Sequence, residues 1–460
     1  MMDLVFPDAF FSGHDAKVSL SSQSFHVKTQ DEEITVPVSH IIGILDVKRE
    51  ESDVQKGLAP NQRAILKLLF VEDIVQHQSS DQSPDLRFRD LTFSFSSSSQ
   101  DAAPIIIPPL YLAQLPSHLL SLPSDRSPNI HVIISTYSGT QKAAAFSSKV
   151  LRPLLISLGI YAYNVHVTMT ADSVSDLTRT RFLPAANNGI PQLIILLSGD
   201  GGISDMVDTL LSEGLDENAT MPTVALIPMG TGNALFNSAC RPRPGRQEGE
   251  IPESIKSEID YHDIPDATSG LRTLLHGVPR RIPTLTSTFS PGSQFVSYPS
   301  PPKSGSTATD TNPLKSQSPF TSLDPTPILS PLPPQNTLHG CILASWCLHA
   351  SLVSLSDAPR YRVQGISRFQ SAASELLSPA DGKGMHMYRG RVEIQREAGG
   401  SWSSLQSEAE HDPNPVQKYS YILATLVSHL EPTFLISPAS IPSSGLASSS
   451  PSSQPASDSL

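Results

Sequence analysis

Between residues 131 and 282, strand-like and helix-like hydrophobic patterns alternate along the chain. Leu193–Leu197 is apolar at every position, which is typical of a strand buried on both faces of a parallel sheet. Lys142–Leu158 instead carries apolar residues at helical spacing and is followed by Gly159, a common helix stop. The predicted strands are His131–Ser135, Tyr161–Thr168, Leu193–Leu197 and Thr223–Pro228, and the predicted helices are Lys142–Leu158, Ser173–Arg179, Ile203–Leu211 and one that begins over Ala234–Ala239. This alternation predicts a parallel sheet with helices on both faces.

Residues 1–125 contain short β-like runs that are separated by polar and proline-rich stretches. The runs are Ser24–Lys28, Ile34–Val38, Ile41–Val47, Ala64–Phe70 and Leu91–Phe95. The interruptions include Ser96–Gln100 and Pro104–Pro109. We therefore expect a β-rich N-terminal extension, whose role the sequence does not indicate.

Segments of low complexity interrupt the C-terminal half. Thr284–Asn336 is rich in Ser, Pro and Thr, so it has little apolar surface to offset the entropy of ordering, and we expect a disordered insert. Strand-like or mixed apolar patterns resume over Leu338–Trp346, Tyr388–Ile394 and Tyr419–Ile436, and Ser367–Leu377 fits a helix. The resulting map has the extension at 1–125, the alternating domain at 126–279, the insert at 280–337, a partial β-rich domain at 338–437 and a disordered tail at 438–460.

Composition and charge narrow the class of protein. Of 460 residues 41 are Pro, and only 38% are apolar and 17% charged, which excludes a uniformly packed globule. The formal net charge of -12 argues against a nucleic-acid partner, because no general basic field exists to replace phosphate counterions. The three cysteines show no metal-ligand or disulfide spacing. No secretory signal and no apolar run of membrane-spanning length occurs, so we expect a cytoplasmic protein with at most peripheral contact to intracellular membranes.

Two glycine-rich turns are the strongest candidates for chemistry. Ser198–Gly202 (SGDGG) directly follows one predicted strand, and Gly230–Asn233 (GTGN) directly follows the next. A right-handed crossover places both turns at the carboxyl edge of one sheet. Backbone N–H groups and helix N-termini there favour an anion. Each turn alone is more often a plain strand–helix connection, but two in consecutive units indicate a phosphate site. Neither turn fits the Walker or GxGxxG spacing.

Asp200 occupies the apex of the first turn. A carboxylate among phosphate-binding amides is unfavourable unless it meets Mg²⁺ or takes a proton from a nucleophile. The alternative is an Asx-turn or helix N-cap residue, because Asp is common in both positions.

These motifs resemble a known catalytic domain. The run SGDGGISDMVDTL followed by IPMGTGNAL is similar to the diacylglycerol-kinase-type domain shared by sphingosine and diacylglycerol kinases. Upstream, ISTYSGTQKA (Ile134–Ala143) resembles the first nucleotide loop of that family. Downstream, Ser345–Phe369 and Met387–Ile394 resemble the sphingosine-kinase branch. The implied fold is an α/β nucleotide-binding domain with a parallel sheet, of the kind also found in NAD kinases, joined to a partial antiparallel β-sandwich lipid domain.

The resemblance implies roles for individual residues. Asp200 would be the catalytic aspartate that acts as base for a lipid hydroxyl. Arg362 and Arg368 match arginines that face the nucleotide phosphates, and Asp357 is the nearest acid to the position of a lipid head-group ligand. The implied ATP-binding set is Ser138, Gly139, Thr168, Gly199, Gly201, Gly202, Gly230, Thr231, Gly232, Asn233, Arg362 and Arg368. ATP and Mg²⁺ are the implied cofactors, and no metal ligand is directly assigned.

The sequence also departs from the family pattern. Gln141 replaces a glycine of the first loop, and Gly202 replaces a Thr or Leu. Ser351 and Val353 stand where the sphingosine-kinase branch has two aspartates. A closing acidic DGE-type strand pair is absent, so we expect a C-terminally truncated lipid domain.

The function implied is an ATP-dependent kinase that phosphorylates the primary hydroxyl of a sphingoid long-chain base at a transiently contacted membrane surface. Two lipid alternatives are a diacylglycerol kinase and a ceramide kinase. A third is a catalytically impaired nucleotide- or lipid-binding remnant, and a fourth is an NAD-kinase-like enzyme, against which the downstream Arg-Phe and YRGR segments argue.

Overall fold

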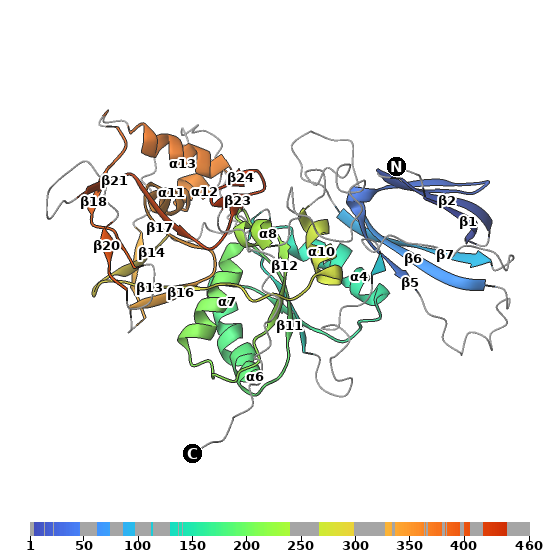
Figure 1. Cartoon of the computed structure of the whole chain (residues 1–460), viewed down its shortest axis with the longest axis horizontal. Helices are drawn as coiled ribbons and strands as arrows, with labels where there is room; N and C mark the ends of the chain where they lie inside the picture. Colours follow the sequence, from blue (N-terminus) through green and yellow to red (C-terminus); the bar gives the residue numbers. More distant parts are fainter. Residues whose placement is uncertain are drawn as a thin grey trace, which may run out of the picture.

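The computed structural model of the chain forms three parts that lie in a row, with the N-terminal sheet at one end, the parallel sheet in the middle and the C-terminal part at the other end (Figure 1). The residues that the structure describes are 4–12, 14–21, 23–46, 62–73, 86–96, 112–113, 129–136, 138–139, 141–239, 266–298, 327–333, 336–362, 364, 367–379, 382, 384–395, 400–404 and 417–438.

The middle part is built on a four-stranded parallel sheet, as the alternating pattern predicts. Its strands are β9 (Ile130–Ile134), β10 (Asn164–Val167), β11 (Leu193–Ser198) and β12 (Thr223–Pro228), in the order β10-β9-β11-β12. Every residue of β9 and β11 is buried, which accounts for their unbroken apolar runs. All four strands and their parallel arrangement are thereby confirmed.

Helices cover both faces of this sheet. One face of β9 and β11, represented by Val132 and Leu197, packs against Leu154 and Leu271. The opposite face packs against a second set of helices, whose buried residues include Met206. The helical segments are α3 (Ala143–Phe146), η2 (Ser147–Leu151), α4 (Arg152–Ser157), α5 (Ser173–Leu177), η3 (Thr178–Phe182), α6 (Leu183–Asn187), α7 (Asp200–Ser212), α8 (Ala234–Ala239) and α10 (Asp266–His276). The predicted helices are confirmed, although α10 was not expected.

The N-terminal part is an eight-stranded sheet in the order β4-β3-β2-β1-β7-β6-β5-β8. All neighbouring strands are antiparallel except β5 and β8. The strands are β1 (Leu4–Phe11), β2 (His14–Leu20), β3 (Ser24–Lys28), β4 (Glu33–Pro37), β5 (Ile41–Asp46), β6 (Gln62–Asp73), β7 (Leu86–Ser96) and β8 (Leu112–Ala113), with the short helix η1 (Val38–His40) before β5. Five of these strands match the predicted β-like runs.

This sheet shares a hydrophobic core with the middle part. Leu69, Val71 and Phe88 belong to the same buried cluster as the residues of α4 and α10. Arg272 of α10 donates hydrogen bonds to the carbonyl oxygens of Val38 and Ile41, at 2.5 and 2.7 Å. Because unpaired buried carbonyls are unfavourable, these bonds fix the sheet against α10. The N-terminal extension is therefore an integral layer against the central domain.

The C-terminal part consists, within the described residues, of antiparallel strand pairs and three helices. The pairs are β13 (Leu285–Thr288) with β16 (Thr337–Gly340), β14 (Gln294–Ser297) with β15 (Ile328–Pro331), β17 (Leu343–Cys347) with β22 (Tyr421–Thr425), β18 (Tyr388–Gly390) with β21 (Gln417–Tyr419), β19 (Glu393–Ile394) with β20 (Ser403–Ser404), and β23 (His429–Glu431) with β24 (Phe434–Leu435). The helices are α11 (Leu348–Ser356), α12 (Pro359–Arg362) and α13 (Arg368–Leu377).

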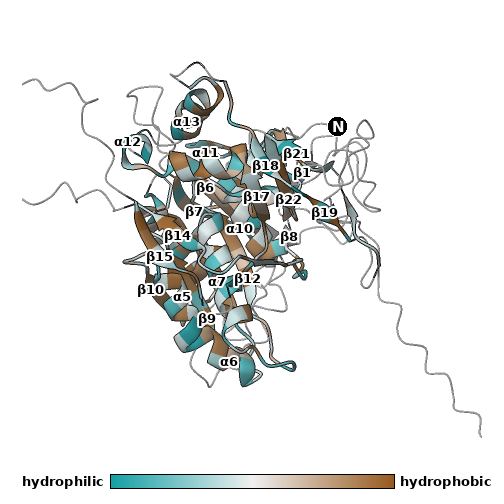
Figure 2. Cartoon of the chain, turned by 90° about the vertical axis from the view of Figure 1, so that its left-hand side faces the viewer, coloured by the Kyte–Doolittle hydropathy of each residue, from teal (hydrophilic) through white to brown (hydrophobic). Residues whose placement is uncertain are grey.

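Strands β13, β14 and β15 correct the expectation of disorder throughout 280–337. The Ser and Pro content of this segment hides short stretches with apolar β-forming residues, and these stretches pair with each other or with β16. Val296 and Leu329 are cross-strand partners and both are more than half exposed, and the apolar positions of this ribbon are brown in Figure 2. Residues 299–326 and the predicted tail from 439 onward lie outside the described residues. Of the helices that the structure describes, none is both long and apolar enough to cross a membrane.

Candidate active site

The turns that follow β9, β11 and β12 meet at the carboxyl edge of the parallel sheet, as the two glycine motifs predict. The backbone of Met229 donates a hydrogen bond to Ser198 O at 3.1 Å, and Asp200 N–H donates to Gly232 O at 3.0 Å. The SGDGG and GTGN turns are therefore bonded to each other through their main chains.

Glycine is required where these turns touch. A Cβ at Gly199 would lie 2.8 Å from Gly230 Cα, and a Cβ at Gly230 would overlap the backbone of Gly199. Gly139, in the turn after β9, has φ +53°, and a Cβ there would overlap the carbonyl oxygen of Met229. Three backbone segments thus approach one another more closely than any side chain permits.

Asp200 begins α7 and reaches across to the next helix. Its carboxylate oxygens accept hydrogen bonds from the N–H groups of Ala234 and Leu235, at 2.7 and 3.1 Å, and so cap the start of α8. Burial raises the pKa of Asp200, and these two backbone hydrogen bonds act in the opposite direction. Each oxygen keeps a second lone pair, so the capped carboxylate can still accept a proton from a hydroxyl group.

Asn233 closes the GTGN turn on itself. Gly230 N–H donates to Asn233 Oδ1 at 3.2 Å, and Asn233 Nδ2 donates to Gly230 O at 3.0 Å. The amide therefore shapes the loop that holds Thr231 and Gly232. In this arrangement, Asn233 would contribute to a phosphate site by setting the direction of backbone N–H groups.

Two further predicted residues, Ser138 and Thr168, lie at the loop that follows β9. Ser138 lies in a series of hydroxyl contacts, 2.6 Å from Ser135 Oγ and 3.4 Å from Ser198 Oγ. Thr168 is buried and fixes the loop after β9, because its carbonyl accepts a 2.7 Å hydrogen bond from Thr136 Oγ1. Sequence reasoning did not single out Ser135 or Ser198, whose small polar side chains gave no distinct signal.

The two glycines that follow Asp200 differ in their surroundings. Gly201 is exposed, and a Cβ there would have no neighbour within 4 Å. Gly202 is buried, and a Cβ there would lie 2.6 Å from Ser198 Oγ. Ser198 therefore occupies the space that a side chain at position 202 would need, which fits glycine at this position.

Arg362 and Arg368 lie together in the C-terminal part, and Arg368 reaches the GTGN turn. Arg368 Nη2 is 3.4 Å from Thr231 Oγ1, and Arg368 Nη1 is 3.3 Å from Asp357 Oδ1. Arg362 Nη2 lies 3.8 Å from Asp357 Oδ2. The structure therefore brings the predicted arginines to one of the predicted loops and pairs both of them with Asp357.

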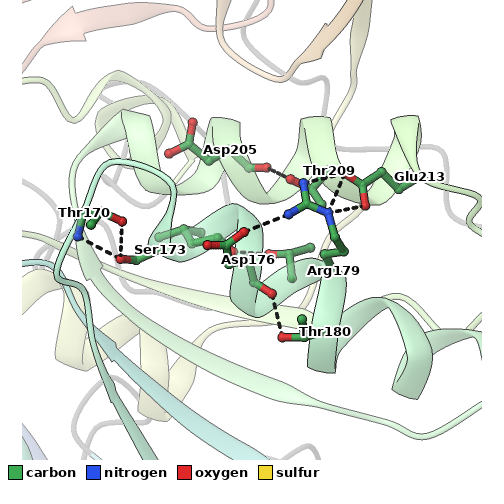
Figure 3. Close-up of polar contacts among 10 residues, drawn as sticks. Thr170, Ser173, Asp176, Arg179, Thr180, Asp205, Thr209 and Glu213 are labelled. Atoms are coloured by element: carbon green, nitrogen blue, oxygen red, sulfur yellow. Dashed lines mark hydrogen bonds and ion pairs between the residues drawn. The ribbon is translucent and has the colours of Figure 1, made fainter. Parts of the chain in front are cut away.

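A separate charged network joins η3 to the C-terminal end of α7, away from Asp200 at the other end of that helix (Figure 3). Arg179 donates to both carboxylate oxygens of Glu213 and, at 2.8 Å, to Asp176. The Asp205 side chain points away from this network, as Figure 3 shows. Burial raises the pKa of Asp205 to about 6, and the nearby charges of Asp172 and Asp208 add to the shift.

Substitution of Asp205 by Asn is expected to raise the free energy of unfolding by about 1 kcal/mol at pH 7.5 and to have no effect near pH 4. The pKa of Asp205 is about 6 in the folded state and 3.8 in the unfolded state. The protonated carboxyl therefore costs no stability below pH 3.8, and the folded protein loses stability as the pH rises through about 6 and the buried carboxyl ionises. Asn cannot ionise, so it avoids that loss. Urea unfolding at both pH values measures the effect. Asp176→Asn serves as control, and an Asp205→Asn gain of equal size at both pH values would contradict the assignment.

The residues fit a nucleotide triphosphate. The glycine turns bring the main chains of two loops together beside Thr231, and the Arg368 cation lies at the same turn. Among the described residues no group of three or more His, Cys, Asp or Glu side chains is placed to hold a metal ion. In phosphoryl transfer a divalent ion such as Mg²⁺ is usually held in part by the nucleotide phosphates themselves.

A comparison with protein families supports the catalytic-domain resemblance. The sequence profile of the diacylglycerol kinase catalytic domain matches residues 129–263, which include β9 to α8 and all three turns. No curated protein matches the chain. Two solved structures of a protein described as a candidate diacylglycerol kinase from Bacillus anthracis str. Sterne match at 15% identity and a TM-score of 0.23, covering 36% and 34% of this chain. The chain aligns with less than half of those proteins, 43% and 44% of their lengths.

Residues 129–263 thus contain a diacylglycerol kinase catalytic domain, as the two central loops indicate. The resemblance to the sphingosine-kinase branch and the expected truncation stay predictions.

Proposed function

We propose that the chain is an ATP-dependent lipid kinase that phosphorylates the primary hydroxyl of a sphingoid long-chain base at a membrane surface that it contacts transiently. The lipid oxygen forms a bond to the γ-phosphorus while the bond from that phosphorus to the β–γ bridging oxygen breaks. The hydroxyl proton passes to Asp200, and ADP leaves.

Each part of the site has a role in this reaction. The main chain around Gly139, Gly199 and Gly230 would hold the phosphates, with Thr231 and the turn that Asn233 closes. Arg362 and Arg368 would stabilise the charge that spreads over the transferred phosphoryl oxygens. Bound Mg²⁺ would supply further charge neutralisation at the phosphates.

One observation carries the proposal: Asp200 and the glycine turns lie in a single backbone-bonded cluster, and an arginine from the C-terminal part reaches that cluster. Capping of α8 accounts for the Asp200 carboxylate, but a strand–helix connection has no need of a cation from another part of the chain. Phosphoryl transfer uses both a base and fixed cations.

The test is phosphoryl transfer by the purified full chain from labelled ATP with Mg²⁺ to a panel of vesicle-presented sphingoid base, ceramide and diacylglycerol. We expect a labelled phosphate ester of the sphingoid base. Transfer only to diacylglycerol or ceramide would assign the chain to another acceptor class. ATP binding without transfer to any lipid would favour the impaired nucleotide-binding remnant.

A neutral acceptor is the second candidate, because of the hydroxyl groups near α11. Ser351 Oγ lies 2.5 Å from Tyr388 Oη, where the sphingosine-kinase branch has a carboxylate. Asp357 is already paired with two arginines. A hydroxyl pair can accept or donate to a neutral glycerol or amide head group but gives an amine no countercharge. The same lipid panel distinguishes this candidate.

A further inference from the structure

Asp357 joins the two arginines of the C-terminal part to each other, close to the GTGN turn. We infer that Asp357 is a positioning residue for ATP, which holds Arg368 and Arg362 where their charges meet the nucleotide phosphates. The inference rests on the proposed function, because it takes the phosphates to lie at this turn.

Asp357 lies between the end of α11 and the start of α12, and these two helix ends act on a carboxylate in opposite directions. Asp357 follows the last residue of α11, and its N–H donates to Ser354 O at 3.3 Å. A negative charge at the C-terminal end of a helix is unfavourable, because the helix dipole is negative there. The ion pairs that the structure gives for its side chain are with the guanidinium groups of Arg362 and Arg368.

Arg368 is held from two sides. Nη1 faces Asp357 at 3.3 Å and Nη2 faces Thr231 at 3.4 Å, while the guanidinium carbon lies over the Phe369 ring, 4.7 Å from its centroid. The Arg368 side chain is only 18% exposed, and among the described residues its buried Nε has no hydrogen-bond partner. Without Asp357, only the long contact to the Thr231 hydroxyl and the Phe369 ring would be left among these contacts to orient the guanidinium.

The charge balance of this cluster suits an anion. Two guanidinium groups and one carboxylate leave one net positive charge beside Thr231. The ion pairs, at 3.3 and 3.8 Å, join Asp357 to one nitrogen of each arginine, and each Nη group carries two N–H donors, so neither pair occupies a whole guanidinium. An amine head group would instead have to compete with both arginines for Asp357, which makes a lipid-binding role for this carboxylate less favourable.

The test is the Asp357→Asn variant, which keeps the side-chain shape and removes the charge. We expect the KM for ATP to rise about five- to tenfold, between the effects of an exposed and a buried ion pair, while the KM for the lipid stays within about twofold. Asp357→Glu should restore most of the loss. Fluorescence titration with an ATP analogue measures the same effect without turnover.

The matched control is Glu375→Gln in α13, because Glu375 pairs with Arg360 and has no ion pair or hydrogen bond to Arg368 or Thr231 in the described structure. It should leave the KM for ATP unchanged. A rise in the KM for lipid alone would make Asp357 a head-group ligand, and tighter ATP binding would make it a competitor of phosphate. Either result, or no change, overturns the inference. Wild-type protein that binds no ATP would overturn the proposed function as well.

Discussion

Replacing Asp200 by Asn is expected to lower kcat for lipid phosphorylation at least about a hundredfold, the usual size of a general-base contribution. An amide cannot take the proton of the attacking hydroxyl. The fold should persist, because the Asn oxygen can still accept one of the two N–H groups at the start of α8. Loss of the other hydrogen bond should lower the free energy of unfolding by about 1 kcal/mol. Single-turnover transfer and urea unfolding measure the two effects.

Asp200→Ala is the companion variant. It removes both capping bonds and should cost about 1–2 kcal/mol of stability, but it should lower kcat no further than Asn does. The wild-type rate should also fall in acid, with an apparent pKa above the ordinary value of 3.8, because burial raises the pKa of Asp200. An Asn variant that retains full transfer would exclude the role of base.

The meeting of the two glycine turns could be predicted from sequence. Parallel strands end at one edge of a sheet, so Ser198 and Pro228 had to lie side by side once their strands were recognised. The motifs then placed Gly199 and Gly230 at that edge. The sequence therefore predicts that these two turns lie close together.

Contacts made by residues far apart in the chain could not be predicted in this way. The sequence offered Asp200 as a base, an Asx-turn residue or a helix N-cap, but that it caps α8 depends on how two loops fold onto each other. The attachment of the N-terminal sheet depends on Arg272 of α10, a helix that was not predicted from the sequence. In the same way α11, a run of Leu, Ser and Val without charges, has no clear helical periodicity.

Asp357 shows how the structure changes the meaning of a predicted residue. The sequence offered it as the nearest acid for a lipid head group. The structure places its carboxylate between two arginines, on the side of the nucleotide loops. A residue that sequence spacing assigns to the lipid can instead act on the nucleotide, because spacing does not show which side chains from other helices contact it.

Gly230→Ala is expected to abolish detectable ATP binding and to lower the free energy of unfolding by about 1–3 kcal/mol, the usual cost of overpacking a tight site. The added Cβ would overlap the backbone of Gly199 and lie 2.9 Å from Gly232 O, so the two turns would have to separate. Separation would also weaken the bond from Asp200 N–H to Gly232 O. Fluorescence titration with an ATP analogue and urea unfolding provide the measurements.

Gly201→Ala is the matched control for this prediction. Its Cβ would have no neighbour within 4 Å, and alanine favours the first turn of α7 by up to about 1 kcal/mol over glycine. This variant should bind ATP normally and unfold no earlier than the wild type. Gly199→Ala should reproduce the Gly230→Ala loss, and the double variant should lose less stability than the sum of the two, because both remove the same contact. Normal ATP binding by Gly230→Ala would mean that the phosphates do not depend on the meeting of these two turns.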